Sequence, residues 1–247
     1  MPATDSPHPL IVSYLQVRRA IGYLGLFLPW ALVIWTLLNR EPFLGSISDY
    51  YHSPMRDVFV GTMIALAVFL WSYRGYQRAP GQWLSDAWTA RVASVSAALL
   101  AISPVDSSGG DAVGSSLTDD ACTLVSCLIG AYPADRLHVA AATIFFVALT
   151  LFCLVLFPRA AADTPARQVR RRIYQACGLV MAACLILIAA WFLVEDTTLG
   201  GALARYSPVF WLEAVAIWAF AVSWMAKGKA LDGMIRGLSR GSHPLQA

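Results

Sequence analysis

The chain has 247 residues, of which 58% are hydrophobic and 13% charged, and its formal net charge is +3. A soluble domain carries about 25% charged residues, so this composition excludes an ordinary soluble globular protein. The small net charge gives no signal for nucleic-acid binding. The apolar residues form blocks long enough to cross a bilayer, which needs about 20 residues of helix. We therefore expect an all-α, polytopic membrane protein with a single domain.

Six apolar segments are expected to form a bundle of transmembrane helices. The first follows two arginines, as a signal peptide would, but it is long and lacks a small-residue cleavage site, so we expect an uncleaved helix. The third is short and rich in Ala and Ser. It is expected to be a buried central helix, with a soluble amphipathic helix as the alternative. The six segments are 20–38, 55–73, 88–105, 137–157, 174–194 and 207–226.

Basic residues predict the orientation of these helices, because Lys and Arg are enriched in cytoplasmic loops. With the N-terminus inside, segments 1–19, 74–87, 158–173 and 227–247 are cytoplasmic and hold most of the basic residues. Both termini are thus expected in the cytoplasm, in a protein of the cytoplasmic membrane with an outer loop over 106–134. The juxtamembrane cluster ARQVRRRIY would either fix this topology or meet anionic lipid headgroups.

The five cysteines divide between the membrane and its outer side. Cys153, Cys177 and Cys184 lie within predicted helices, where we expect small buried hydrophobes. Cys122 and Cys127 lie in the outer loop, on the oxidising side of the membrane, and are candidates for a local disulfide.

The sequence carries no familiar catalytic signature on its cytoplasmic side. It has no Walker A, G-x-G-x-x-G, H-E-x-x-H or G-x-S-x-G motif. The middles of the predicted spans lack ionisable residues, which argues against a proton-driven pump or an ion channel. No internal repeat supports an inverted-repeat transporter.

The longest polar motif is GSISDYYHSPMRDVF, residues 45–59, which leads into the second predicted helix. Ser53 followed by Pro54 is typical of an N-cap with proline at the first helical position. The motif therefore places polar side chains just before the helix and in its first turn. These residues are Ser48, Asp49, His52, Arg56 and Asp57.

Further ionisable residues are expected at the same outer level of the membrane. Asp106 follows the third predicted helix, His138 lies about one turn inside the fourth, and Glu213 lies between one and two turns inside the sixth. An unpaired carboxylate at the depth of Glu213 is costly, so Arg56 or His138 would serve as its partner. The grouping predicts a polar, ligand-binding pocket at the outer leaflet; alternatively, these residues only tie helix ends together.

A short stretch of this motif also carries a family resemblance. The sequence S-I-S-D at 46–49 is followed by Pro54, Arg56 and Phe59, and a second stretch has His138 before Ala141 and F-F at 145–146. With these residues the chain resembles the Frag1/DRAM/Sfk1 group and the related DUF998 proteins, which are six-helix membrane proteins. The resemblance implies six helices, cytoplasmic termini and a lipid-related role.

Ser48 and His52 form an S-x-x-x-H element with Asp49 beside it. In this the chain is more distantly similar to membrane hydrolases of the alkaline ceramidase and adiponectin receptor kind, which bind zinc. Those proteins have seven spans and a late H-x-x-x-H, which is missing here. His52, His138 and Glu213 would therefore have to bind the zinc, and two imidazoles with a carboxylate are ligands that a catalytic zinc uses.

Two functional hypotheses follow, with a small-molecule transporter as a third. In the first, a non-enzymatic protein binds or regulates a membrane lipid, with Arg56 meeting a headgroup and Asp49, His52, His138 and Glu213 shaping the pocket. In the second, a metal-dependent hydrolase cleaves a lipid amide or ester, with Asp49 orienting an imidazole or accepting a proton. Membrane lipids are the expected partners, and nucleic acid is not.

Overall fold

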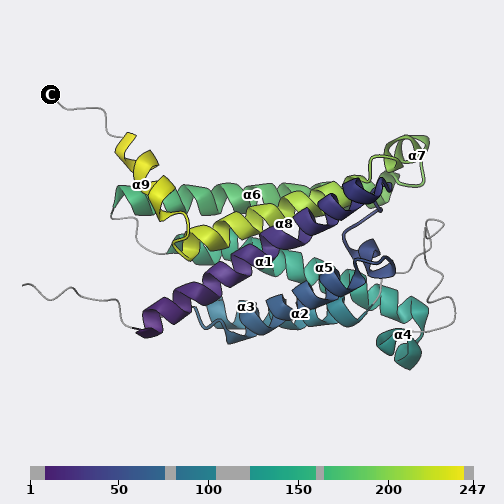
Figure 1. The fold of residues 1–247 in the computed structure, drawn as a ribbon, viewed down its shortest axis with the longest axis horizontal. Helices are drawn as coiled ribbons and strands as arrows, with labels where there is room; N and C mark the ends of the chain where they lie inside the picture. The colour runs from purple at the N-terminus through teal and green to yellow at the C-terminus, as the bar shows by residue number, and fades with distance from the viewer. Residues whose placement is uncertain (1–8, 76–81, 104–122, 160–163, 242–247) are drawn as a thin grey trace, which may run out of the picture.

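The computed structural model describes residues 9–75, 82–103, 123–159 and 164–241, which form an elongated helical bundle (Figure 1). No strand occurs within these ranges, so the all-α prediction is confirmed for them. Of the earlier candidates, Asp106 and Cys122 lie outside the described residues.

Six long helices make up the bundle, and each of the six predicted segments is largely helical. Within the described residues, four helical stretches are long and apolar enough to cross a membrane: Tyr14–Asn39, Ala131–Arg159, Pro165–Val194 and Pro208–Lys227. The other two helices have 17 residues each, slightly fewer than the usual span. The six are α1 (Pro9–Asn39), α2 (Arg56–Ser72), α3 (Asp86–Ile102), α5 (Ala131–Leu151), α6 (Pro165–Val194) and α8 (Pro208–Lys227).

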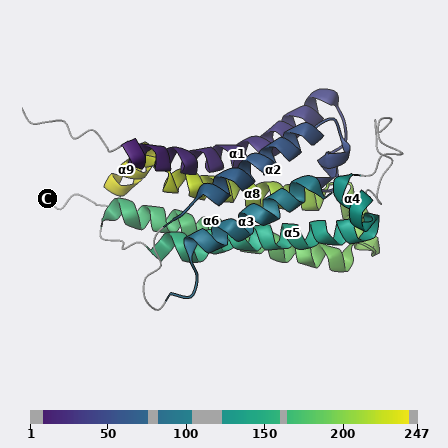
Figure 2. The ribbon, with the colours of Figure 1, turned by 90° about the horizontal axis from the view of Figure 1, so that it is seen from below.

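Short helices mark the two ends of the bundle (Figures 1 and 2). Helices α4 (Leu124–Ile129) and α7 (Thr198–Ala204) lie at one end, called the α7 end here, together with the 3₁₀ helix η1 (Ser48–His52). Helix α9 (Asp232–Gly241) and the start of α1 lie at the opposite α9 end. Near that end α5 continues through a π-helical turn, η2 (Phe152–Leu156), and the 3₁₀ turn η3 (Phe157–Arg159).

The start of the second helix differs from the prediction. Helix α2 has Met55 rather than Ser53 as its N-cap. Ser53 instead closes η1, because its N–H and its hydroxyl both donate to the carbonyl of Tyr50, at 3.2 and 2.8 Å. The Ser53 hydroxyl also accepts from the Met55 N–H at 3.1 Å, as an N-cap side chain would, so the predicted capping bond is present although the α-helix begins at Arg56.

Burial is confirmed for one face of the third helix, whereas Trp88 and Val95 on its other side are 63% and 50% exposed. Helix α3 packs against both α2 and α5. Its small residues form the buried face, and the hydroxyl of Ser94 donates to the carbonyl of Ala67 in α2 at 2.6 Å. Small side chains allow this close approach of helix backbones.

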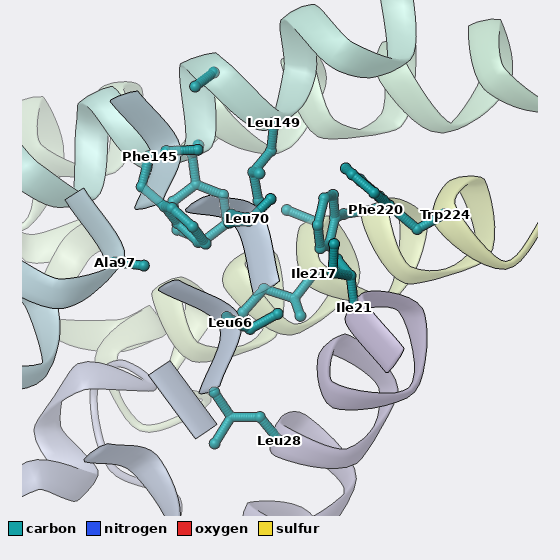
Figure 3. Close-up of a cluster of buried hydrophobic side chains, with 14 of the residues drawn as sticks. Ile21, Leu28, Leu66, Leu70, Ala97, Phe145, Leu149, Ile217, Phe220 and Trp224 are labelled. Atoms are coloured by element: carbon teal, nitrogen blue, oxygen red, sulfur yellow. The ribbon is translucent and has the colours of Figure 1, made fainter. Parts of the chain in front are cut away.

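The bundle interior is apolar, and part of its outer surface is apolar as well. Side chains from α1, α2, α5 and α8, including Leu28, Leu66 and Phe145, point into a common core (Figure 3). On α6, by contrast, Ile186 and Leu193 are 68% and 82% exposed. Large exposed apolar patches mark surfaces that meet another apolar phase, which agrees with a membrane protein.

The described cysteines follow the predicted division in most respects. Cys153 and Cys184 are buried, Cys177 is half-buried, and all three are free thiols. Cys127 is disulfide-bonded. The proposed pairing with Cys122 stays a prediction, because Cys122 lies outside the described residues.

Candidate functional site

Hydrogen bonds connect the segment between α1 and α2 to the first turns of α8. Helix starts carry backbone N–H groups without intrahelical partners, and one of these bonds satisfies such a group. Together the bonds hold η1 over the α7 end of α8. From donor to acceptor, they run from the Ser207 hydroxyl to the Phe43 carbonyl (2.8 Å), from the Phe210 N–H to the Gly45 carbonyl (2.9 Å), and from the Ile47 N–H to Glu213 Oε2 (2.7 Å).

Glu213 therefore has a backbone partner. The sequence predicted that Arg56 or His138 would pair with this carboxylate, but the hydrogen bond comes from the N–H of Ile47. Arg56 donates to the hydroxyl of Tyr51 at 2.9 Å, and its guanidinium carbon lies 4.4 Å from the centre of that ring. The predicted ion pair is thus replaced by a carboxylate–backbone contact and a separate cation–π contact.

Asp49 is held in place by reciprocal hydrogen bonds with Ser46. Its Oδ2 accepts from the Ser46 N–H at 2.7 Å, while its own N–H donates to the Ser46 hydroxyl at 3.1 Å. This S-x-x-D pattern is the arrangement of a capping box. Burial raises the pKa of Asp49, and the bonds from Ser46 and the charges of His52 and His138 oppose that rise.

His138 is fixed between α5 and the end of α3. The side chain is 2% exposed, and its Nδ1 lies 2.6 Å from the carbonyl oxygen of Ser103. Because a carbonyl can only accept, Nδ1 carries a proton. The Ser103 hydroxyl in turn donates to the carbonyl of Ala134 at 2.8 Å. Nε2 of His138 is buried and has no hydrogen-bond partner in the described part of the chain.

A small cavity lies inside the bundle beneath η1. Its volume is about 20 Å³ for the centre of a water-sized sphere, enough for about one water molecule. Two polar side chains, Ser48 and Glu213, line it, and the other lining residues have apolar side chains. These are Leu28, Ile47, Phe59, Met63, Leu100, Ala142, Phe145, Phe146 and Ile217.

A second, wholly apolar cavity of about 10 Å³ adjoins the first. Leu28, Met63, Phe145 and Ile217 line both cavities. The second continues past Leu66, Leu149 and Phe220 toward the middle of the bundle, through the core drawn in Figure 3. The interior thus has a small cavity with a polar group beside a smaller, wholly apolar one.

Four of the predicted site residues are close enough to interact electrostatically. Asp49 interacts with His52, His138 and Glu213, and the two histidines interact with each other. Asp57 is exposed on the first turn of α2. The structure thus places these four residues in one region, but of the predicted site residues only Ser48 and Glu213 line the cavity.

The described residues do not assemble a metal site. No three His, Cys, Asp or Glu side chains among them are placed so that they could hold a metal ion. His52, His138 and Glu213 share one region, but the first histidine contacts the Tyr51 ring at 5.4 Å and the carboxylate bonds to backbone. The geometry of these three residues therefore gives no support to the zinc-binding hypothesis.

A second cluster, of buried charged residues near the α9 end, was not predicted from the sequence. Arg18, Asp86 and Lys227 are only 6%, 3% and 7% exposed. The guanidinium of Arg18 lies 4.2 Å from the Tyr14 ring centre, and Lys227 Nζ lies 4.7 Å from that of Phe157. In the sequence, charged residues at such positions indicate only which side of the membrane a segment faces. Aromatic residues near the ends of the same predicted helices were the one available hint of burial.

Comparison of the chain with protein-family models, with curated proteins and with solved structures finds no match. The resemblance to the Frag1/DRAM/Sfk1 group therefore stays a prediction based on the motif that contains Ser48 and Arg56. The more distant similarity to the membrane hydrolases likewise stays a prediction. The geometry of the α7 end is the remaining basis for a functional proposal.

Proposed function

We propose that this protein is a six-span protein of the cytoplasmic membrane that binds a lipid-like amphiphile within its bundle, near the outer leaflet. One observation carries the proposal. One small cavity is lined by Glu213 and Ser48, and a second, lined only by apolar residues of four helices, lies beside it. A ligand with a polar head and an apolar tail matches that distribution.

The orientation in this proposal follows from the charges at the two ends. The α9 end is rich in basic residues, while Glu195 and Asp196 lie at the end of α6 near α7. Because cytoplasmic loops are enriched in Lys and Arg, the α9 end would face the cytoplasm. The basic residues near the α9 end include Arg18, Arg19, Arg159, Arg167, Arg170, Arg171, Arg172, Lys227 and Lys229.

Helices α2 and α3 are short for this role but within the range that bilayers accommodate. At about 1.5 Å per residue, their 17 residues extend about 26 Å. A hydrocarbon core of about 30 Å adapts to such a helix by local thinning. Both helices also pack on neighbours inside the bundle, which reduces their contact with lipid.

The cavities would have to widen to admit a ligand, because the first has room for about one water molecule and the second is about half as large. Met63 lines both of them. Methionine has an unbranched, flexible side chain that adapts to irregular spaces. We propose that movement of Met63 and of the other residues shared by the two cavities joins and widens them, so that the head lies at Glu213 and the tail lies beside Leu66 and Phe220.

Binding is favoured over hydrolysis by the arrangement of the polar groups. A zinc hydrolase needs three protein ligands and an open position for water, and the described residues offer no such group. A carboxylate that accepts a backbone N–H, as Glu213 does, is suited to holding a polar head in a fixed position.

The proposal is tested by native mass spectrometry on protein extracted together with its surrounding lipid. We expect a stoichiometric bound amphiphile, which Met63→Phe displaces by filling the space between the chambers. Val68→Phe is the matched control, because Val68 lies on the same helix and is 58% exposed. Retention of the amphiphile by Met63→Phe, or its absence from the unaltered protein, would contradict the proposal.

The orientation has its own test. A single cysteine introduced at Thr197, near the α7 end, should react with a membrane-impermeant maleimide added to intact cells. One introduced at Arg167, near the α9 end, should react only after the cells are opened. The reverse pattern would invert the proposed topology.

A further inference from the structure

We infer that the head of the bound amphiphile is a positively charged hydrogen-bond donor, such as a primary amine on a single alkyl chain. The inference deepens the proposed function and rests on it. It follows from the groups near the cavity that can accept a hydrogen bond or carry a negative charge, chiefly the Glu213 carboxylate.

The two carboxylates near the cavity each have one oxygen bonded to the backbone. Glu213 Oε2 accepts from Ile47 and Asp49 Oδ2 accepts from Ser46, both at 2.7 Å. Asp49 also has a side-chain hydrogen bond with Ser46, whereas the second oxygen of Glu213 receives no hydrogen bond from the described residues. Since Glu213 lines the cavity, its second oxygen is available to a donor that enters there.

His138 adds a third acceptor nearby. Its Nδ1 proton is directed to the carbonyl of Ser103, and a charged imidazole would be costly at 2% exposure. In the neutral form Nε2 is an acceptor, and it has no partner among the described residues. His138 lies one helical turn from Ala142, which lines the cavity, and residues four apart share a helix face.

The positive charges of the region do not line the cavity. No Lys or Arg is among the lining residues. Arg56, in the first turn of α2, is bonded to the hydroxyl of Tyr51 and lies over its ring. His52 contacts the same ring at 5.4 Å. A phosphate or carboxylate head would therefore meet acceptors without a cation to neutralise it.

The charges of the carboxylates favour an ammonium head for a further reason. Asp49 and Glu213 repel each other when both are ionised, and burial by itself favours the neutral form of each carboxyl, so the ionised pair needs a nearby cation. Opposite charges attract strongly where water is largely excluded. An ammonium beside Glu213 would offset this repulsion and would supply three N–H donors. A neutral hydroxyl supplies one O–H donor but no positive charge, and a carboxylate or phosphate anion supplies no positive charge either.

The test is competition among amphiphiles that share one tail. The protein in lipid nanodiscs is given dodecylamine, dodecanol, dodecanoate or dodecyl phosphate at equal mole fraction, and occupancy is read by native mass spectrometry. We expect dodecylamine to bind at least about tenfold more tightly than either anion, which corresponds to about 1.4 kcal/mol, and dodecanol to lie between. Dodecyltrimethylammonium, which has the charge without the N–H donors, should bind more weakly than dodecylamine.

A substitution of Glu213 tests whether this side chain distinguishes the amine from the other head groups. Glu213→Gln retains a carbonyl for the N–H of Ile47 but removes the charge, so it should lower dodecylamine binding about tenfold and leave dodecanol binding unchanged. Glu195→Gln, at an exposed position on the same end, is the matched control and should change neither.

The outcomes separate the two proposals. Equal or tighter binding of dodecanoate or dodecyl phosphate would overturn the amine inference while leaving an amphiphile-binding cavity. Dodecylamine binding that is the same in Glu213→Gln as in the unaltered protein would also overturn it. If none of the amphiphiles binds, the proposed function itself is wrong.

Discussion

Removal of the Glu213 carboxylate should destabilise the protein mainly by leaving one backbone group without a partner. The N–H of Ile47 donates to Oε2 at 2.7 Å, and the Ile47 residue is 3% exposed. A buried donor left unsatisfied costs about 1–3 kcal/mol, although hydrogen bonds measured within membrane proteins average about 0.6 kcal/mol. We expect Glu213→Ala to lower the free energy of unfolding by about 2 kcal/mol.

Glu213→Gln should lower it by less than about 1 kcal/mol, because the amide oxygen can still accept from Ile47. The free energies are measured by steric trapping in bicelles. Glu195→Ala, at an exposed position on α6, is the control and should stay within about 0.5 kcal/mol of the unaltered protein. If Glu213→Gln is as unstable as Glu213→Ala, or if Glu213→Ala matches the control, the assigned role of the hydrogen bond is wrong.

Three further predictions concern other positions. Thr36→Val removes the hydroxyl that lies 2.6 Å from the Tyr50 hydroxyl and should lower the free energy of unfolding by about 1–2 kcal/mol in the same assay. The double variant with Tyr50→Phe should lose less than the sum of the two single losses. Strictly additive losses would contradict this hydrogen bond. Because burial raises the pKa of Asp49 above 3.8, the protonated form favours folding, and the free energy of unfolding should fall as pH rises from about that value through the folded-state pKa. Asp49→Asn should flatten this slope, and an unchanged slope would refute it. Gly178→Ala places a Cβ 2.5 Å from Leu154 Cδ2 and should lower the melting temperature in detergent through a loss of about 1–3 kcal/mol; an unchanged melting temperature would contradict this close approach.

The positions of the long helices could be predicted from the sequence because the bilayer imposes a length and an apolar composition on each span. Helix ends were less predictable. Ser53 and Pro54 matched a helix start, but a serine near a turn can bond to backbone on either side. Here the serine closes η1 and the helix begins at Arg56. The N-terminal end of α1 was likewise missed, since Pro9–Val17 is not apolar throughout.

The site was predictable in composition and less so in its pairings. Asp49, His52, His138 and Glu213 were expected near one another, and they interact electrostatically. Their hydrogen-bond partners are mostly backbone groups, such as the Ile47 N–H and the Ser103 carbonyl. The position of a backbone group depends on the path of the chain between helices, and residue identity does not encode it. Side-chain pairing alone therefore led to the wrong partner for Glu213.

The same limit explains why the charges near the α9 end were missed. Lys and Arg at the ends of apolar segments are expected from topology alone, so nothing distinguished Arg18 and Lys227 from the exposed Arg171. Their burial depends on the rings of Tyr14 and Phe157 beside them, which only the packed bundle brings into contact.

The most direct test of amphiphile binding inside the bundle is photo-cross-linking with a fatty amine that carries a diazirine on its tail. Peptide mapping after irradiation should find the probe on the residues that line both cavities, chiefly Met63, Phe145 and Ile217, and an excess of dodecylamine should abolish these cross-links. Cross-links confined to the exposed apolar face of α6, such as Ile186 and Leu193, would mean that the amphiphile meets only the outer surface and would contradict an internal binding site.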